Sequence, residues 1–223
     1  MSNVIALNPS DSDLAPSDPS LPGSGKREQT KLANRRAILD AAREVFGEMG
    51  YETATVRDII RRTNLSVGAF YNYYRSKEEV YEALADDGAR RFRPILQAQY
   101  EKASDFPSYI RGAIEAYYNF IVEEEIKDQR PANIQDHRRP HVHGETPEMQ
   151  AVFEQVRFSI SDVLARNHKP AVDAEYLAAA CIAIARELGD RMVERRPIDV
   201  PGAVEFAVSL ILGGLPALPR VDS

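Results

Sequence analysis

Apolar residues beyond position 26 recur at steps of three and four, which is the period of an α-helix and not of a β-strand. The segment from 26 to 50, KREQTKLANRRAILDAAREVFGEMG, shows the pattern most clearly. Its apolar face consists of Ile38, Ala41, Ala42, Val45, Phe46 and Met49. Gly50 follows it, and glycine commonly ends helices. Because no later segment alternates apolar and polar residues, we predict an all-α fold without internal repeats.

Three helix starts follow this segment in quick succession. Thr55 and Asp58 have the spacing of a capping box, in which a hydroxyl and a carboxylate bind free backbone N–H groups. Ser66 can cap a third helix, and Ser76 with Glu79 forms a second box that starts a long fourth helix. Two short helices joined by a tight turn, behind one longer helix, indicate a helix-turn-helix.

The rest of the chain predicts a bundle of longer helices. Pro94 should kink or break the fourth helix. The segment DQRPANIQDHRRPHVHGETPE contains three prolines and a glycine, so we expect one short helix and much loop there. Further helices are expected at about 108–125, 146–167, 173–195 and 200–215.

Charge is distributed unevenly along the chain, whose formal net charge is −6. Residues 26–77 contain eleven Lys/Arg and six Asp/Glu, a balance of +5, and the remainder contains seventeen and twenty-eight, a balance of −11. This asymmetry suggests a basic module on an acidic body, as in a nucleic-acid-binding protein. Chance variation of the surface gives a similar asymmetry, so charge alone does not decide.

Several features predict a cytoplasmic protein. Residues 1–25 are rich in Pro, Ser and Asp, so we expect a disordered leader without a secretory signal. The longest apolar run is broken by glycine and proline and falls short of the roughly 20 residues of a membrane span, so we expect no membrane partner. Cys181, the single cysteine, excludes an intrachain disulfide.

The stretch from Ala37 to Leu84, AILDAAREVFGEMGYETATVRDIIRRTNLSVGAFYNYYRSKEEVYEAL, resembles the TetR family of bacterial transcriptional repressors. The resemblance lies in the A-A-x-x-x-F ending of the first helix, in GYETATVRDI and in SVGAFYNYYRSKEEV, and it covers about a fifth of the chain. It implies a helix-turn-helix DNA-binding domain at 26–75. It also implies a larger helical domain at 76–223 that binds a ligand and dimerises.

The residue types of the third helix agree with that reading. A recognition helix approaches the major groove closely and needs small leading residues, while tyrosine hydroxyls reach phosphate oxygens and Asn72 could read a base edge. We expect Phe70 and Tyr74 to face the core and Tyr71 and Tyr73 to face outward. Alternatively, all four rings could fill the core of a small helical bundle. The predicted DNA-binding residues are Lys31, Arg35, Thr55, Ser66, Val67, Gly68, Ala69, Tyr71, Asn72, Tyr73 and Lys77.

The family resemblance implies an effector pocket in the C-terminal helices. Their aromatic residues would suit an apolar or aromatic molecule, although each ring alone could simply fill the core. The predicted ligand-binding residues are Phe92, Tyr117, Tyr118, Phe120, Phe153 and Phe158.

The last two helices are apolar on more than one side, so we expect them to be buried both in their own subunit and against a second copy. Paired about a two-fold axis, they would make a four-helix interface. The predicted interface residues are Leu177, Cys181, Ile184, Leu188, Val204, Val208 and Ile211.

A metal site is not expected. His137, His141 and His143 lie close together, but Pro140 interrupts the segment and no cysteine is nearby, which favours an exposed basic loop or a ligand contact. The sequence has no catalytic triad signature and no phosphate-binding glycine loop, so we expect neither an enzyme nor a cofactor.

The sequence thus predicts a homodimeric regulator that binds double-stranded DNA at a pseudo-palindromic operator. We expect a repressor that is released by a small apolar or aromatic effector. Two alternatives stay open, namely a ligand-dependent activator of the same family and a helical small-molecule-binding protein without operator function.

Overall fold

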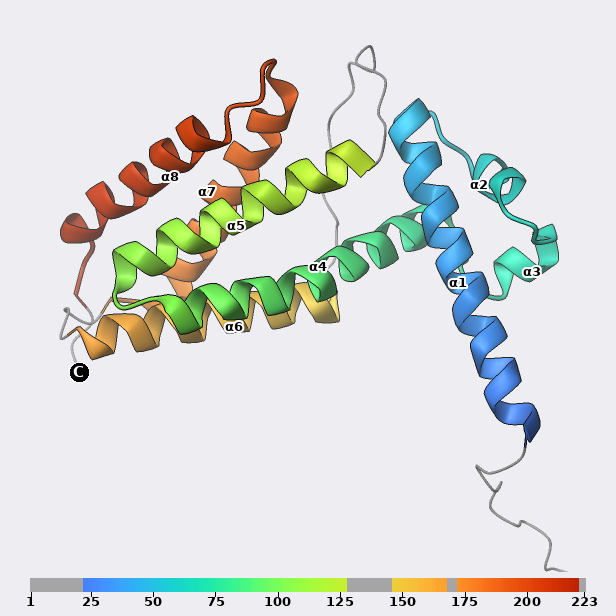
Figure 1. Ribbon diagram of the computed structural model, residues 1–223, viewed down its shortest axis with the longest axis horizontal. Coiled ribbons are helices and arrows are strands. Elements are labelled where there is room, and N and C mark those ends of the chain that lie inside the picture. The colour runs from blue at the N-terminus through green and yellow to red at the C-terminus, as the bar shows by residue number, and fades with distance from the viewer. Residues whose placement is uncertain (1–21, 128–145, 168–171, 221–223) are drawn as a thin grey trace, which may run out of the picture.

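A computed structural model describes residues 22–127, 146–167 and 172–220, and these ranges contain helices and no strand (Figure 1). The elements are α1 (Pro22–Met49), α2 (Val56–Arg62), α3 (Val67–Tyr71), α4 (Lys77–Lys102), α5 (Phe106–Lys127), α6 (Pro147–Arg166), α7 (Ala174–Glu194), α8 (Val200–Gly214) and a short 3₁₀ turn (Leu215–Ala217). The predicted all-α fold is confirmed.

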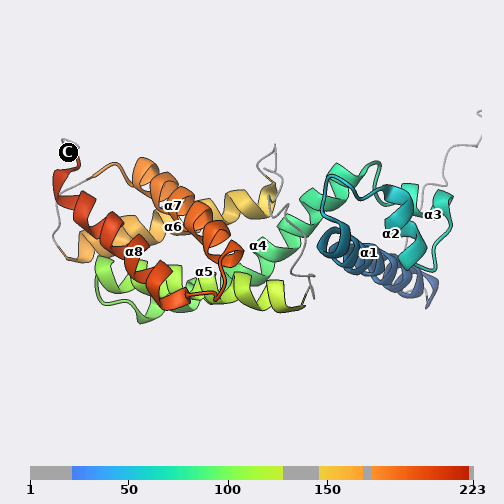
Figure 2. The same cartoon turned by 90° about the horizontal axis from the view of Figure 1, so that it is seen from above.

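The helices form two groups that share α4 (Figures 1 and 2). Helices α1, α2 and α3 pack around a first hydrophobic cluster, hereafter the module core, which includes Ile38, Ile59 and Phe70. Helices α5 to α8 pack with α4 around a second cluster, the body core. Helix α4 supplies Val80 to the module core and Phe92 to the body core. The domain boundary at residue 75 stays a prediction.

Local capping explains where the short helices begin. Both hydrogen bonds of the Thr55–Asp58 capping box are present at the start of α2, and Ser66 Oγ accepts from the Ala69 amide at the start of α3. At α4 the Ser76 hydroxyl accepts from the Glu79 amide, while the Glu79 carboxylate accepts from the amide of Arg75 and not of Ser76. The predicted helix starts are thereby confirmed.

Helix ends differ from expectation in two places. Helix α1 ends as predicted, before Gly50 with a φ of 77°, but it begins at Pro22. The last residues of the expected leader are therefore helical, while residues 1–21 lie outside the described ranges. Helix α4 continues through Pro94, so of the predicted kink or break, the break is wrong and the kink stays a prediction. Burial of Phe92 and Leu96 on either side offsets the one backbone hydrogen bond that proline cannot donate.

Lys77 joins α4 to the connection between α1 and α2. Its ammonium donates to the backbone carbonyls of Tyr51, Glu52 and Ala54 at 2.9, 3.2 and 3.3 Å. It also lies 4.5 Å from the centroid of the Tyr51 ring. Three charge-assisted contacts on one group fix the first turn of α4 against the helix-turn-helix.

We predict that Lys77→Met lowers the free energy of unfolding by about 1–3 kcal/mol, because two partly buried carbonyls and one exposed carbonyl lose a charged donor. Urea denaturation followed by circular dichroism measures the change. Lys102→Met, an exposed position at the other end of α4, is the matched control and should leave the midpoint unchanged. Equal midpoints for both variants would contradict a structural role for Lys77.

Candidate functional site

Helix α3 separates its aromatic side chains between the core and the surface. Phe70 and Tyr74 are buried in the module core, as the sequence predicted. Val67 and Tyr71 are 57% and 51% exposed, although both are large and apolar in body. Asn72 is also exposed, so these side chains form one uncovered surface at the end of the module.

Tyr73 is more enclosed than predicted. Its hydroxyl accepts a hydrogen bond from Asn34 Nδ2 at 3.1 Å, and the neighbouring Tyr74 hydroxyl accepts from Arg35 Nε at the same distance. Burial raises the pKa of Tyr74, so this hydroxyl stays neutral. These two bonds tie the end of α3 to α1. The phosphate contacts predicted for Tyr73 and Arg35 stay predictions, since both side chains also serve the fold.

The fold does not require glycine at position 68. A Cβ atom added there would meet no atom within 4 Å, and the residue has ordinary helical geometry. Glycine nevertheless costs about 1 kcal/mol relative to alanine inside a helix. Gly68 is itself exposed, as are Val67 and Asn72.

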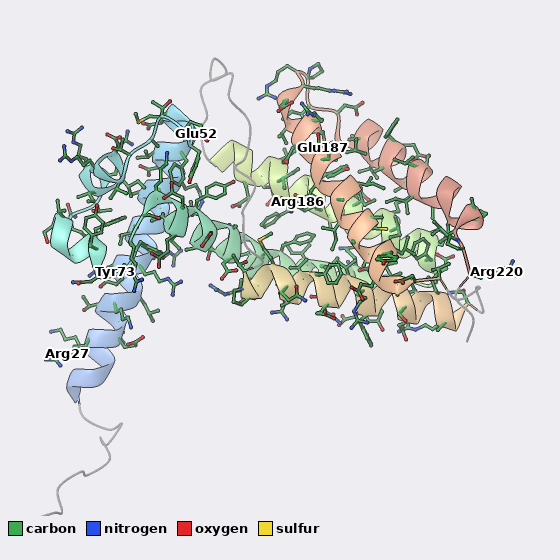
Figure 3. The ribbon with its side chains drawn as sticks, turned by 180° about the vertical axis from the view of Figure 1, so that it is seen from behind. Arg27, Glu52, Tyr73, Arg186, Glu187 and Arg220 are labelled. Atoms are coloured by element: carbon green, nitrogen blue, oxygen red, sulfur yellow. The ribbon has the colours of Figure 1, made fainter. Side chains whose placement is uncertain are left out.

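The first turns of α1 extend past the module core (Figures 1 and 3). Lys26, Arg27 and Lys31 line a shallow hollow there, together with Thr30 and with Tyr73 from the segment after α3. No hydrogen bond or ion pair within the described residues engages these three cationic side chains. The first turns of α1 therefore present an exposed basic surface next to the segment that follows α3.

Sequence reasoning missed two arginines on α2. Arg57 and Arg61 are exposed one helical turn apart, while the next residue, Arg62, is paired with Glu44 and Glu48 of α1. The capping box at Thr55 could have revealed them, because it fixes which positions of α2 face outward. We call Thr55, Arg57, Val67, Gly68, Tyr71 and Asn72 the recognition surface.

A cavity of about 510 Å³ lies between α4, α5, α6 and α7. Four of the predicted ligand-binding rings line it: Phe92, Tyr117, Phe120 and Phe153. The cavity also extends to Phe46 and Tyr81, which pack in or against the module core. Its wall therefore belongs to both hydrophobic cores.

The other two predicted ligand residues do not reach this cavity. Tyr118 is fully buried, and its ring lies where a Cβ on Gly189 of α7 would approach it to 3.1 Å. Phe158 is 58% exposed, with its ring centroid 6.0 Å from that of Tyr100. Aromatic composition identified rings on the right helices, but it did not distinguish the helix face that each ring occupies.

An ionic chain borders the end of the cavity nearest the module. Arg91 of α4 binds Glu124 of α5 through two hydrogen bonds of 2.9 and 2.6 Å and binds Asp87 at 3.1 Å. Asp87 also accepts from Arg43 of α1 at 3.5 Å. Hydrogen bonding to Glu124 raises the pKa of the Arg91 guanidinium, which stays charged. Side chains of α1, α4 and α5 are thus linked beside the cavity.

Most of the predicted dimer residues face the body core of their own chain. Within one chain five of the seven are already buried: Leu177, Cys181, Val204, Val208 and Ile211. They pack into the body core, because apolar periodicity defines a face without saying what covers it. The other two, Ile184 and Leu188, are partly buried against the same core.

The opposite faces of α7 and α8 are apolar and exposed. Both helices lie side by side on the outside of the body (Figure 2). The exposed residues are Tyr176, Ala180, Ala183, Phe206, Leu210 and Gly213, hereafter the outer α7–α8 face. By length and composition alone, the stretch 200–217 could also cross a membrane, with a mean hydropathy of 1.6 and 22% of it buried.

Among the described residues, reactive and metal-binding groups form no further site. His137, His141 and His143 lie outside the described residues. Within the described ranges, no three His, Cys, Asp or Glu side chains are placed to hold a metal ion. Burial raises the pKa of the Cys181 thiol to about 12, so it is protonated and unreactive at neutral pH.

Comparison with known proteins relates this geometry to regulators of transcription. Residues 38–84 match the family model described as bacterial regulatory proteins, tetR family. The chain is 27% identical over 208 residues to the HTH-type transcriptional activator FasR of Mycolicibacterium smegmatis. This alignment covers 91% of the present chain and 93% of FasR. It is 40% identical over 72 residues to the HTH-type transcriptional repressor Rv1474c of Mycobacterium tuberculosis, a match that spans 32% of this chain and 38% of that relative.

The chain shares its fold with a solved structure over most of the length of both. The regulator FadR from Bacillus subtilis, solved in complex with stearoyl-CoA, superimposes with a TM-score of 0.63 over 80% of this chain and 98% of that chain, at 14% identity. The family match covers the α1–α4 segment that carries the recognition surface, and both curated relatives are transcriptional regulators. The chain is accordingly a regulator of transcription and not an enzyme, and its residues 38–84 form a domain of the tetR family of bacterial regulatory proteins.

Proposed function

We propose that the protein is a homodimeric, cytoplasmic repressor that binds a pseudo-palindromic operator and releases it when a small apolar or aromatic molecule enters the cavity. The observation that carries the proposal is the position of the cavity, whose wall includes Phe46 and Tyr81 beside the module core and Phe92 in the body core. A ligand there contacts both groups of helices at once. It can therefore favour one relative orientation of the module over another.

The recognition surface supports DNA binding through its shape. Gly68 and Ala69 give α3 a low profile, so that its backbone could approach base edges in the major groove. Val67 is an apolar, exposed side chain of the kind that contacts a thymine methyl group. Arg57 and the basic turns of α1 would add phosphate contacts that position the helix without reading sequence.

We predict that Gly68→Ala weakens operator binding by at least about tenfold, about 1.4 kcal/mol, because a methyl group would hold α3 away from the groove. The same change should raise the free energy of unfolding by up to about 1 kcal/mol, because alanine favours the helix. Fluorescence anisotropy with labelled duplex and urea denaturation measure the two effects.

Gly88→Ala is the matched control for this variant. Gly88 also has no atom within 4 Å of an added Cβ, but it lies on α4 beside the cavity. In the absence of ligand it should stabilise the fold while leaving DNA affinity unchanged. Equal DNA affinity of Gly68→Ala and the parent protein would contradict the assignment of α3 as the reading helix.

The outer α7–α8 face supports dimerisation. A soluble protein does not leave the apolar faces of two adjacent helices uncovered without a partner, and a second copy related by a two-fold axis would bury both. Glu205, in the middle of α8, is held by Arg111 of α5 at 2.9 Å, which keeps a charged pair at the border of this face. Dimerisation would also present two α3 helices to successive major grooves, about 34–36 Å apart.

We predict that Phe206→Glu converts the dimer to a monomer, because it places a charge in the centre of the outer α7–α8 face. Sedimentation velocity at micromolar concentration measures the assembly. Phe158→Glu is the matched control, since Phe158 is 58% exposed and Phe206 is 62% exposed, but Phe158 lies on α6. A dimer in both variants would exclude this interface.

The cavity favours an aliphatic form of the effector. The Bacillus subtilis regulator of the same fold holds stearoyl-CoA. In the present chain the part of the cavity away from the module is lined by side chains such as Leu96, Ile110 and Val156, which offer contact to a hydrocarbon chain and no polar group. Phe92 and Phe120 beside them would accept an aliphatic or an aromatic body.

A second candidate function is a ligand-dependent activator, whose affinity for DNA rises when the ligand binds. This candidate is supported by FasR, an activator of which 93% aligns with this chain. In that case the ligand would favour the orientation that fits the operator, and DNA affinity would rise with ligand. The cavity and its two walls are the same in both cases, so the sign has to be measured.

Selection of bound sequences from a random duplex pool, repeated at two salt concentrations, tests the proposed function. We expect a two-fold symmetric motif whose half-site spacing reports the separation of the α3 helices. Enrichment of no motif, with affinity that collapses as salt rises, would show only phosphate attraction and would contradict operator recognition.

A further inference from the structure

We propose that Arg186 selects effectors that carry an anionic group, so that the ligand is an amphipathic anion with an apolar body and a carboxylate or phosphate head. This inference rests on the proposed function, because it assigns the chemical class of the molecule that enters the cavity. It goes beyond an apolar or aromatic effector by giving that molecule a charge and a fixed orientation.

The cavity is polarised along its length. Its charged lining side chains are Arg43, Arg91, Glu124, Arg186 and Asp190. The first three belong to the ionic chain beside the module, and the other two flank Gly189, which lies against Tyr117 and Ile121 on the same half of α5 as Glu124. Helix α5 shows the gradient directly, since its lining residues run from Ile110 and Ile114 to Glu124, which binds Arg91 in the ionic chain. A ligand with one polar end and one apolar body would fit this gradient in one direction only.

Two of the three lining arginines are already neutralised. Arg43 pairs with Asp40 at 2.9 Å and with Asp87 at 3.5 Å. Arg91 is held by Glu124 in a two-fold hydrogen-bonded pair and by Asp87. Their guanidinium groups have protein partners, so a ligand anion would have to displace a carboxylate to reach either one.

Arg186 differs from both. It follows Ile182 and Ala185 on the cavity side of α7, and its side chain is exposed at the rim (Figure 3). Within the described part of the chain it forms no hydrogen bond or ion pair. Its planar fork of donors matches the geometry of a carboxylate or phosphate, and the apolar wall beside it lowers the local dielectric and strengthens such a contact.

The acidic residues near Arg186 are engaged elsewhere. Glu187 accepts from Arg191 at 3.0 Å, Glu124 is bound to Arg91, and Asp190 has an interaction of its own. None of these carboxylates is paired with the Arg186 guanidinium, so its charge stays available to a ligand at the cavity rim.

The test compares ligands of equal chain length with different heads, titrated calorimetrically into the full chain below their micellar concentrations. Dodecanoate and dodecyl phosphate carry the anion, and 1-dodecanol is the neutral reference. We expect one or both anions to bind roughly tenfold or more tightly than the alcohol, as charge-assisted hydrogen bonds imply. Comparison of the two anions identifies whether a carboxylate or a phosphate is preferred.

Arg186→Gln should abolish the preference, and Arg186→Lys should retain part of it, because lysine keeps the charge without the fork. Arg191→Gln is the matched control: it removes the same charge from the same helix at a residue that does not line the cavity, and it should leave the preference intact. Because the Arg186 side chain has no hydrogen-bond or ion-pair partner among the described residues, its replacement should not alter the thermal midpoint.

Two results would overturn the inference. Equal affinity for the anions and the alcohol in the parent protein, or a preference that survives Arg186→Gln, would refute the role of Arg186 and leave the proposed apolar effector standing. Failure of all three ligands to bind would contradict the aliphatic effector as well, while operator selection would still report on DNA binding separately.

Discussion

The side chains of α4 belong to two hydrophobic cores, and the relation between the two groups of helices depends on that one element. Val80 is fully buried with Ile38 and Phe70 in the module core, and further along the same helix Phe92 and Leu96 are buried in the body core. Pro94 does not interrupt the helix between them. A rigid helix anchored at both ends transmits a change of packing from one core to the other.

The proposed regulation follows from what surrounds α4. A ligand in the cavity would contact α4 along its length, while the ionic chain from Arg43 through Asp87 and Arg91 to Glu124 links α1, α4 and α5 beside it. If the ligand binds more tightly to an orientation of α4 that separates the α3 helices of a dimer, it shifts the population away from the operator-bound form. The coupling free energy equals the difference between those two affinities.

The sequence predicted where the helices begin better than it predicted what packs against each helix face. Helix starts at Thr55, Ser66 and Ser76 follow from local hydrogen bonds, which nearby residues determine. By contrast, periodicity placed Leu177 and Val204 on apolar faces but could not say whether the same chain or a second copy covers them. Lys77 shows the same limit, since its three carbonyl acceptors lie more than twenty residues away in sequence.

Reciprocal linkage tests the role of α4 most directly. The affinity for the preferred ligand is measured by calorimetry with the free protein and with the protein saturated by its selected operator. For a repressor, we predict that operator weakens ligand binding by the same factor by which ligand weakens operator binding. For an activator, we predict that each strengthens the binding of the other by the same factor. Ligand affinity that is unchanged by operator would contradict coupling between the cavity and the recognition surface.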